Sequence, residues 1–193
     1  MGRKHKGLTF YQRKKRVSIS TVKEIFSYVF IIIFAVFFAG ILTYTFGMST
    51  NVVGVSMEPG LQNGQLIYIN RFAYTLSNPK KGDVIVFLPN GNMNSHYYVK
   101  RVIACSGDRV LIKDGICYVN DIAIDSFSEK IMDSGIAETE MILGSGEYFC
   151  VGDNVNNSED SRSANVGPVK SKDIIGKAWF HGSAGSEKSG FVK

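Results

Sequence analysis

The sequence predicts an all-β domain with antiparallel strands, preceded by a single N-terminal transmembrane helix. One long uncharged segment, rich in Ile, Phe, Val and Ala, lies near the start of the 193-residue chain. Beyond it the sequence changes to short apolar runs divided by Gly, Asn, Asp and Pro, which is typical of strands joined by tight turns. Because no helical periodicity separates these runs, we expect an antiparallel barrel or sandwich.

The uncharged segment is predicted to be a membrane anchor. Ile25–Phe46 contains 22 consecutive residues without a formal charge. A helix of that length measures about 33 Å, enough to cross a bilayer core. A cleaved signal peptide is less consistent with it, since the apolar part of such peptides is about 7–15 residues long and no Ala-x-Ala site follows cleanly. A buried helix of a soluble domain would normally carry a polar stripe.

The charges flanking this segment predict its orientation. Residues 1–24 form a basic tail with one acid, Glu24, and eight basic side chains: Arg3, Lys4, Lys6, Arg13, Lys14, Lys15, Arg16 and Lys23. The positive-inside rule therefore places residues 1–24 in the cytoplasm and residues 47–181 outside the cell membrane. The tail carries a net charge of +7 and the whole chain +5, so the rest of the chain carries about −2. Nucleic acid is thus excluded as a partner, and the tail is expected to contact anionic lipid.

Eight strands are expected in residues 47–181, between turn signals such as Asn63-Gly64, Lys81-Gly82 and Gly107-Asp108. Asp114-Gly115 between two β-rich runs predicts a hairpin. Residues 125–146 are expected to be an insertion or long loop, and residues 182–193 a flexible polar tail. The predicted strands are Asn51–Val55, Gln65–Asn70, Asp83–Leu88, Tyr97–Ser106, Arg109–Lys113, Ile116–Val119, Glu147–Val151 and Ile174–Phe180.

The three cysteines, Cys105, Cys117 and Cys150, are expected to be structural thiols without a disulfide. They are widely spaced and form no CxxC pair, which argues against a zinc site. Each lies in or beside an apolar strand-like run, where cysteine usually acts as a small buried hydrophobe. We therefore expect no metal and no cofactor.

A serine and a lysine are the candidate catalytic pair. Ser56 lies where a predicted strand enters a turn containing Gly and Pro, which would expose its hydroxyl and its amide, although many turn serines share this setting. Lys100 interrupts an apolar run and, by strand alternation, shares a face with Tyr98 and Val102. Desolvation would lower its pKa and make it a general base. Alternatively, Lys100-Arg101 is a solvated edge pair that discourages strand aggregation.

Histidine offers fewer possibilities for the base. His5 belongs to the cytoplasmic tail, and His181 opens the polar C-terminal tail. His96 lies in a polar loop, with nothing distinctive around it. A Ser-His-Asp triad would have to use His96 or His181.

Four blocks of sequence resemble those of bacterial type I signal peptidases, and they occur in that family's order behind one N-terminal span. The resemblance covers about residues 25–180 and implies the family's β-domain, which self-cleaving repressors share. It also implies a membrane-bound serine endopeptidase that removes signal peptides after a small-x-small site with a Ser56–Lys100 dyad. The blocks are Gly54-Val55-Ser56-Met57-Glu58-Pro59-Gly60-Leu61, Lys81-Gly82-Asp83-Val84-Ile85-Val86-Phe87, Tyr98-Val99-Lys100-Arg101-Val102-Ile103-Ala104 with Gly107-Asp108, and Gly152-Asp153-Asn154 through Ser158-Glu159-Asp160-Ser161-Arg162.

The same resemblance implies supporting roles for five further residues. The hydroxyl of Ser158 would orient the Lys100 amine, while Asp160 with Arg162, and Asp153 with Arg101, would form two ion pairs. The Ser56 N–H would be one oxyanion donor.

Two glycines depart from the family's pattern. Some members have a hydroxyl at the position of Gly54, which lacks a side-chain donor, so the second oxyanion donor stays open. Gly60 replaces a common threonine, which could loosen the turn without touching a catalytic atom.

Substrate choice follows from the small residues that end signal peptides. The pockets should be shallow and apolar, and an extended substrate would add a strand beside residues 50–54. Met57 is expected to rest on the bilayer with the apolar surface after Phe46. The expected pocket residues are Val52, Val53, Leu66, Ile67, Tyr68, Val99 and Ile103.

Two other readings remain. Self-cleaving repressors share the β-domain and the Ser–Lys chemistry, but this chain carries a membrane span and no recognisable helix-turn-helix. A catalytically silent or specialised membrane-anchored homologue could instead assist the assembly of surface proteins. Relatives of the silent kind have lost the serine or the lysine, and both residues are present here.

Overall fold

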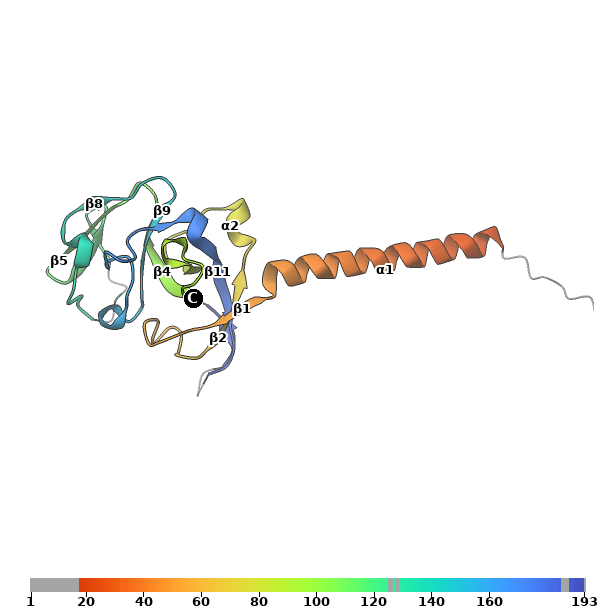
Figure 1. Cartoon of the computed structure of the whole chain (residues 1–193), viewed down its shortest axis with the longest axis horizontal. Coiled ribbons are helices and arrows are strands. Elements are labelled where there is room, and N and C mark those ends of the chain that lie inside the picture. Colours follow the sequence, from red (N-terminus) through yellow and green to blue (C-terminus); the bar gives the residue numbers. More distant parts are fainter. Residues whose placement is uncertain (1–17, 125–126, 128, 185–187, 193) are drawn as a thin grey trace, which may run out of the picture. The chain divides into compact units, whose positions relative to one another are not determined.

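The fold was analysed in a computed structural model that describes residues 18–124, 127, 129–184 and 188–192 (Figure 1). Most of the predicted cytoplasmic tail, including His5 and seven of its basic side chains, lies outside the described residues. The chain divides into two compact units at residues 1–41 and 42–193.

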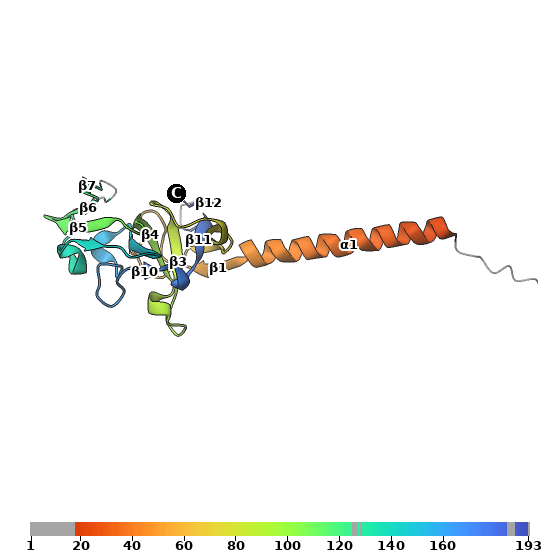
Figure 2. The same ribbon diagram turned by 90° about the horizontal axis from the view of Figure 1, so that it is seen from above.

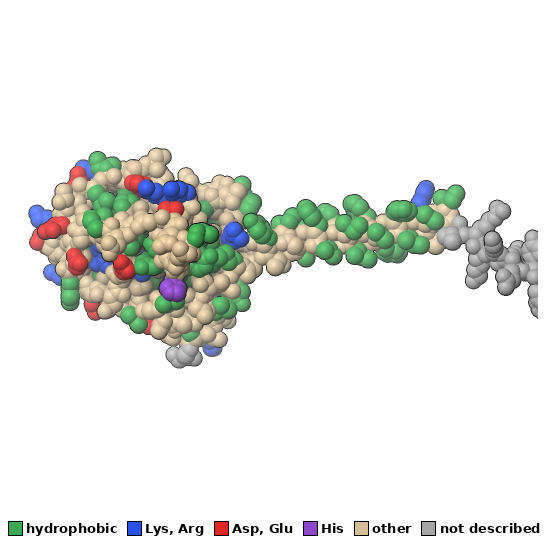
Figure 3. Space-filling view, viewed as in Figure 1, with side chains coloured by type: hydrophobic (Ala, Val, Ile, Leu, Met, Phe, Trp, Pro, Cys, Tyr) green, Lys and Arg blue, Asp and Glu red, His purple; other side chains and the backbone are tan. Residues whose placement is uncertain are grey.

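The N-terminal helix α1 spans Ile19–Phe46 and is 28 residues long. It begins six residues before the predicted start at Ile25, because Lys23 and Glu24 are accommodated in its first turns. Apolar side chains cover much of the side of α1 that Figure 3 shows, and none of its residues is buried. Within the described part of the chain, α1 alone is long and apolar enough to cross a membrane.

The remaining unit contains two antiparallel sheets (Figures 1 and 2), as the sequence predicted. The smaller sheet joins four strands in the order β7 (Ile122–Ala123), β6 (Ile116–Val119), β5 (Arg109–Lys113) and β8 (Met141–Ile142). The larger has eight strands, ordered β1 (Met48–Asn51), β2 (Leu66–Asn70), β11 (Ile174–His181), β3 (Val84–Phe87), β4 (Tyr98–Ala104), β9 (Glu147–Val151) and β10 (Val169–Lys170), with β12 (Gly190–Phe191) paired to β11.

Short helices occupy several of the connections. The α-helix α2 covers Ala73–Leu76. Four 3₁₀ helices complete the fold: η1 (Pro89–Gly91), η2 (Gly135–Glu138), η3 (Val155–Asn157) and η4 (Ser171–Asp173). Both η2 and β8 fall within residues 125–146, so the described part of this expected loop contains regular structure; residues 125, 126 and 128 lie outside the description.

Seven of the predicted strands match observed ones, but the prediction for Asn51–Val55 was wrong. The strand at this place, β1, covers Met48–Asn51 instead. Gly54 has a φ of +82°, a left-handed conformation that cannot continue a strand. The chain therefore leaves the sheet just before Ser56.

The hairpin predicted at Asp114-Gly115 is confirmed. Strands β5 and β6 pair with Lys113 opposite Ile116, so the loop has two residues. Their φ values are 54° and 79°, as the type I′ hairpin turn requires.

The end of the chain differs from the expected flexible tail. Within residues 182–193, Gly190–Phe191 forms β12 and pairs with His181 and Phe180 of β11. The Phe191 ring packs against Trp179 and Phe180, with centroid distances of 6.0 and 5.7 Å. Aromatic packing near the chain end thus outweighs the polar composition around it. Residues 185–187 and 193 lie outside the description.

Strand β4 lies where three buried apolar clusters meet. Val99 belongs to the cluster that includes Val52 and Met57. Val102 belongs to a second cluster, and Ile103 to a third that extends into the small sheet. Because packing holds β4 from several sides, the side chains it carries have little freedom to move.

Candidate active site

Ser56 and Lys100 are in direct contact. The Lys100 Nζ lies 2.7 Å from the Ser56 Oγ, a hydrogen-bond distance. Ser56 belongs to a tight turn in which Glu58 N–H donates to the Val55 carbonyl and Leu61 N–H to the Met57 carbonyl. The turn presents the serine hydroxyl toward β4, 44 residues further along the chain.

Lys100 occupies the face of β4 that strand alternation predicted. It pairs with Ile85 of β3, while Tyr98 pairs with Phe87 two positions away, so Tyr98 and Lys100 share a face. Lys100 is only 5% exposed. Burial lowers its pKa to about 8, against the opposing influence of the Asp160 and Glu159 carboxylates. A substantial fraction of the amine is therefore neutral near physiological pH, as a general base requires.

A cleft of about 310 Å³ lies over the pair. Three of the predicted pocket residues, Val52, Val53 and Val99, line it. Leu66 and Tyr68 do not: they lie on β2, where the Tyr68 ring packs against Phe180. Ile67 and Ile103 are buried in the core instead. The full lining is Val52, Val53, Gly54, Val55, Ser56, His96, Tyr97, Tyr98, Val99, Lys100, Asn157 and Glu159.

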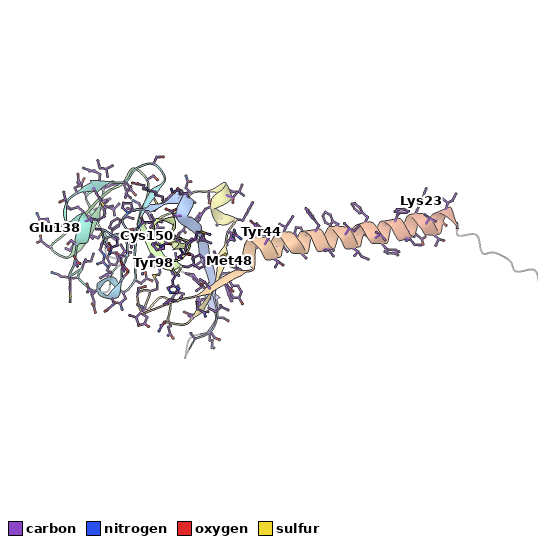
Figure 4. The ribbon with its side chains drawn as sticks, viewed as in Figure 1. Lys23, Tyr44, Met48, Tyr98, Glu138 and Cys150 are labelled. Carbon is purple, nitrogen blue, oxygen red and sulfur yellow. The ribbon has the colours of Figure 1, made fainter. Side chains whose placement is uncertain are left out.

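Sequence reasoning missed several of these residues as part of the site. Tyr97 precedes β4, and Asn157 and Glu159 come from the loop after β9, whereas His96, also before β4, was already weighed as an alternative base. Loop residues carry no periodic signal. Tyr98, which is labelled in Figure 4, could have been predicted, because it lies two residues from Lys100 on the same strand face.

The segment between β9 and β10 contains the predicted pair of Asp160 and Arg162. Arg162 Nε donates to Asp160 Oδ1 at 2.8 Å and Nη2 donates to Oδ2 at 2.9 Å. The Asp160 side chain is fully buried and that of Arg162 is 7% exposed. Asp160 Oδ2 also accepts the Gly152 N–H at 3.1 Å, so the carboxylate connects two parts of the loop.

Ser158 is placed differently from the expectation. Its hydroxyl donates to Asp160 Oδ2 at 2.6 Å, and among the described residues no hydrogen bond joins it to Lys100. Ser158 remains near Ser56: a Cβ on Gly152 would lie 2.4 Å from both the Ser158 Oγ and the Ser56 carbonyl oxygen. Gly152 therefore allows these two segments to pack together.

The second predicted ion pair joins Arg101 to Asp153. Arg101 donates from Nε and Nη2 to the two carboxylate oxygens, each at 2.7 Å. Gly60 explains how close the pair lies to the Ser56 turn, since a Cβ there would come within 2.4 Å of Asp153 Oδ2. The glycine thus gives space to the ion pair, a role that its departure from the family's pattern did not reveal.

Gly54 lines the cleft, but its backbone N–H is already engaged. It donates to Asn63 Oδ1 at 2.9 Å. This hydrogen bond, together with the left-handed φ of Gly54, fixes the path of the backbone that leads to Ser56.

The position expected for Met57 was wrong. Met57 is completely buried and packs in the cluster with Val52 and Val99. A buried side chain cannot rest on a bilayer. Met57 instead anchors the turn that carries Ser56.

No cluster of metal-binding side chains occurs in the described residues. Cys105, Cys117 and Cys150 are free thiols, and the last two are buried. Burial raises the pKa of all three thiols. A raised pKa keeps each thiol in its protonated, less nucleophilic form.

Comparison with known proteins adds independent information. A family model described as "Signal peptidase, peptidase S26" matches residues 25–181. A signal peptidase I of Bacillus caldolyticus is 36% identical over 142 residues, covering 67% of this chain and 75% of that protein. A signal peptidase I of Bacillus licheniformis is 28% identical over 175 residues, covering 84% of this chain and 91% of that protein. A crystal structure of a signal peptidase I from Enterococcus faecalis is 25% identical, with a TM-score of 0.41, and covers 52% of this chain and 97% of that one.

Proposed function

Because this chain belongs to the peptidase S26 family of signal peptidases, we propose that it removes signal peptides from secreted preproteins with Ser56 as nucleophile and Lys100 as general base. The observation that carries the proposal is the 2.7 Å contact between the two side chains in an open cleft. A serine hydroxyl beside a partly neutral amine is an activated nucleophile.

The chemistry proceeds in two stages. In the first, Ser56 Oγ attacks the carbonyl carbon at the cleavage site while neutral Lys100 takes the hydroxyl proton. The peptide C–N bond then breaks, and the Lys100 ammonium returns that proton to the leaving amine. In the second stage, water attacks the acyl-enzyme ester, Lys100 takes the water proton, and the proton passes to Ser56 Oγ as the signal peptide leaves.

The tetrahedral intermediates require hydrogen-bond donors. The Ser56 N–H is the first donor in this proposal. A second donor is not assigned to Gly54, since its N–H already binds Asn63.

The two ion pairs support this proposal as positioning elements. Asp160 and Arg162 fix the loop that faces Lys100, and Ser158 contributes by binding Asp160 rather than the amine. Arg101 and Asp153 connect β4 to the same loop next to the Ser56 turn. Together they hold the nucleophile and the base in one geometry, as catalysis by proximity requires.

The substrate in this proposal is an extended chain with small residues at the first and third positions before the cut. Val52, Val53 and Val99 give the cleft an apolar wall suited to small side chains. Strand β1 lies at the edge of the large sheet, where an extended peptide could add as a further strand.

The proposed location is the cell membrane, with α1 as a single span and the β-domain outside. The length and composition of α1 are compatible with a span. The excess of basic residues before it favours a cytoplasmic N-terminus.

Mass-spectrometric mapping of a serine-directed acylating inhibitor tests the proposal. We expect one inhibitor-dependent adduct on Ser56, lost in Ser56→Ala, with cleavage of a preprotein lost in parallel. The control variant is Ser163→Ala, because Ser163 lies in the same domain outside the cleft. It should still form the adduct on Ser56 and still cleave the preprotein. A Ser56→Ala protein that still cleaves would refute the proposed nucleophile.

A further inference from the structure

Tyr98 and Glu159 form a bridge across the cleft beside Lys100. The Tyr98 hydroxyl donates to Glu159 Oε2 at 2.9 Å. The centroid of the Tyr98 ring lies 5.6 Å from the Lys100 Nζ. All three side chains line the cleft that contains Ser56. The bridge therefore connects β4, which carries the amine, to the loop after β9.

Several charged groups influence Lys100. Asp160, Glu159 and Asp153 favour its ammonium form, and Arg162 opposes it. Two of the three carboxylates have an arginine partner, because Asp160 pairs with Arg162 and Asp153 with Arg101. Among the described residues, Glu159 forms no close ion pair, and its carboxylate accepts the Tyr98 hydroxyl instead.

The other groups that line the cleft have little influence on whether Lys100 is charged. His96 and Tyr97 reach it from the loop before β4, and both are exposed to solvent. Tyr98 is a neutral donor, since burial and the bond to Glu159 raise the pKa of its hydroxyl above the usual value. The aromatic ring and the carboxylate both favour a nearby cation, and burial opposes it.

We propose that Glu159, held in place by Tyr98, is a positioning residue that stabilises the charged form of Lys100 and so moves the acid limit of cleavage to higher pH. The inference rests on the proposed role of Lys100 as general base. The carboxylate favours the ammonium that forms when Lys100 takes the serine proton. It thereby makes the amine a stronger base but requires a higher pH to deprotonate it.

The acid limb of the pH profile of kcat/KM for preprotein cleavage, measured on the full chain in detergent micelles, tests this proposal. Glu159→Gln keeps an acceptor for Tyr98 and removes the charge. We expect its acid limb to move to lower pH, so that the neutral fraction of Lys100 well below its pKa rises roughly two- to fivefold, as for a partly screened charge pair. Tyr98→Phe should move the limb in the same direction by a smaller amount.

A matched control is Glu138→Gln, which removes an exposed glutamate in η2, outside the cleft. Its profile should coincide with that of the wild type. A Glu159→Gln profile that coincides with the wild type, or moves to higher pH, would overturn the proposal. A Tyr98→Phe profile identical to the wild type would overturn the role of the bridge.

A second readout does not depend on cleavage. The rate at which trace acetic anhydride acetylates the Lys100 amine, followed by mass spectrometry across the same pH range, reports the protonation of that amine directly. Glu159→Gln should shift this curve to lower pH as well. If the acetylation curve shifts while Lys100→Met still cleaves, Glu159 acts on the amine as proposed, but the catalytic role of Lys100 and the link to the acid limit of cleavage both fail; if Lys100→Met is inactive and the curve does not shift, the inference alone fails.

Discussion

Lys100 shows how its surroundings change the chemistry of one residue. A lysine at the surface is almost entirely charged at neutral pH and is a poor base. At 5% exposure on β4, desolvation penalises the ammonium, and nearby carboxylates reduce that penalty without removing it. The resulting pKa of about 8 leaves the amine able both to accept a proton and to return it.

This pKa predicts the pH dependence of cleavage. The protonated form of Lys100 cannot act as a base, so kcat/KM should fall about tenfold for each pH unit below a midpoint near 8. Above the midpoint the amine is neutral and the rate should reach a plateau. Steady-state assays from pH 5.5 to 9.5 check this, and a rate that still rises steeply with pH at 9.5, without a plateau, would mean that the base is an ordinary exposed lysine.

Gly152 predicts a second effect at the residue scale. In Gly152→Ala the new methyl group would meet the Ser56 carbonyl and the Ser158 hydroxyl at 2.4 Å, so the backbone beside the nucleophile must move. Such overpacking costs about 1–3 kcal/mol of stability. Displacing Ser56 from Lys100 by about 1 Å should lower kcat by roughly a hundredfold.

Thermal unfolding and steady-state kinetics measure the two effects of Gly152→Ala. Gly182→Ala is the matched control, since its nearest neighbours would lie at 3.6 Å, an ordinary van der Waals contact. Normal kinetics in Gly152→Ala would show that the close packing at this glycine is not needed for catalysis.

At the scale of elements, the predictable strands are those with both an apolar pattern and a turn signal. Strands β5 and β6 match their predicted bounds because Asp114-Gly115 defines the turn between them. The two-residue strands β7, β8, β10 and β12 are too short to show a period of two. The end of β1 could not be predicted either, because the valines around Gly54 continue a strand-like composition where the backbone turns away from the sheet.

The candidate site was predictable to a different extent. Ser56 and Lys100 became candidates because the resemblance in four sequence blocks selected both, while strand alternation placed Lys100 on an apolar face. Glu159 and His96 reach the cleft through loop conformations that depend on contacts between distant segments, such as Asn154 N–H with the Ser56 carbonyl. Leu66 and Tyr68 do not line the cleft, because no residue of β2 reaches it, and apolar composition alone does not say which strands border a cleft.

The β5–β6 hairpin gives a prediction about stability alone. Gly115 has a φ of +79°, and its Cβ would lie 3.1 Å from the Ile131 carbonyl, so Gly115→Ala should lower the free energy of unfolding by about 1–2 kcal/mol. Asp114→Asn, which suits a left-handed φ, should be nearly neutral. Chemical denaturation measures both. The hairpin is not part of the cleft, so a large loss of kcat/KM in correctly folded Gly115→Ala would contradict its purely structural role.

At the scale of the whole molecule, the last residues of α1 belong to the same compact unit as the β-domain. Leu42 begins that unit, and the Phe46 ring packs edge-on against Trp179 at a centroid distance of 5.7 Å. Arg71 lies over the Tyr44 ring at 4.9 Å. These contacts hold the end of the helix to the domain that contains the site.

The proposed topology makes a prediction in intact cells. Protease added to spheroplasts should degrade residues 47–193 while an N-terminal epitope tag stays protected until detergent is added. The basis is the charge difference across α1. A tag that is digested first would reverse the orientation, and recovery of the protein in the soluble fraction would exclude the anchor.

The central claim is that Lys100 is the base for Ser56, and the most direct test is preprotein cleavage in detergent micelles by the wild type, Lys100→Met and Lys113→Met. Lys113 is exposed on β5 and serves as the control. We expect the wild type and Lys113→Met to cut after a small-x-small site, and folded Lys100→Met to lose activity by a factor of at least about 10³, as for a lost base. Cleavage by Lys100→Met at a rate near that of the wild type would contradict the account and direct attention to His96, which lines the same cleft.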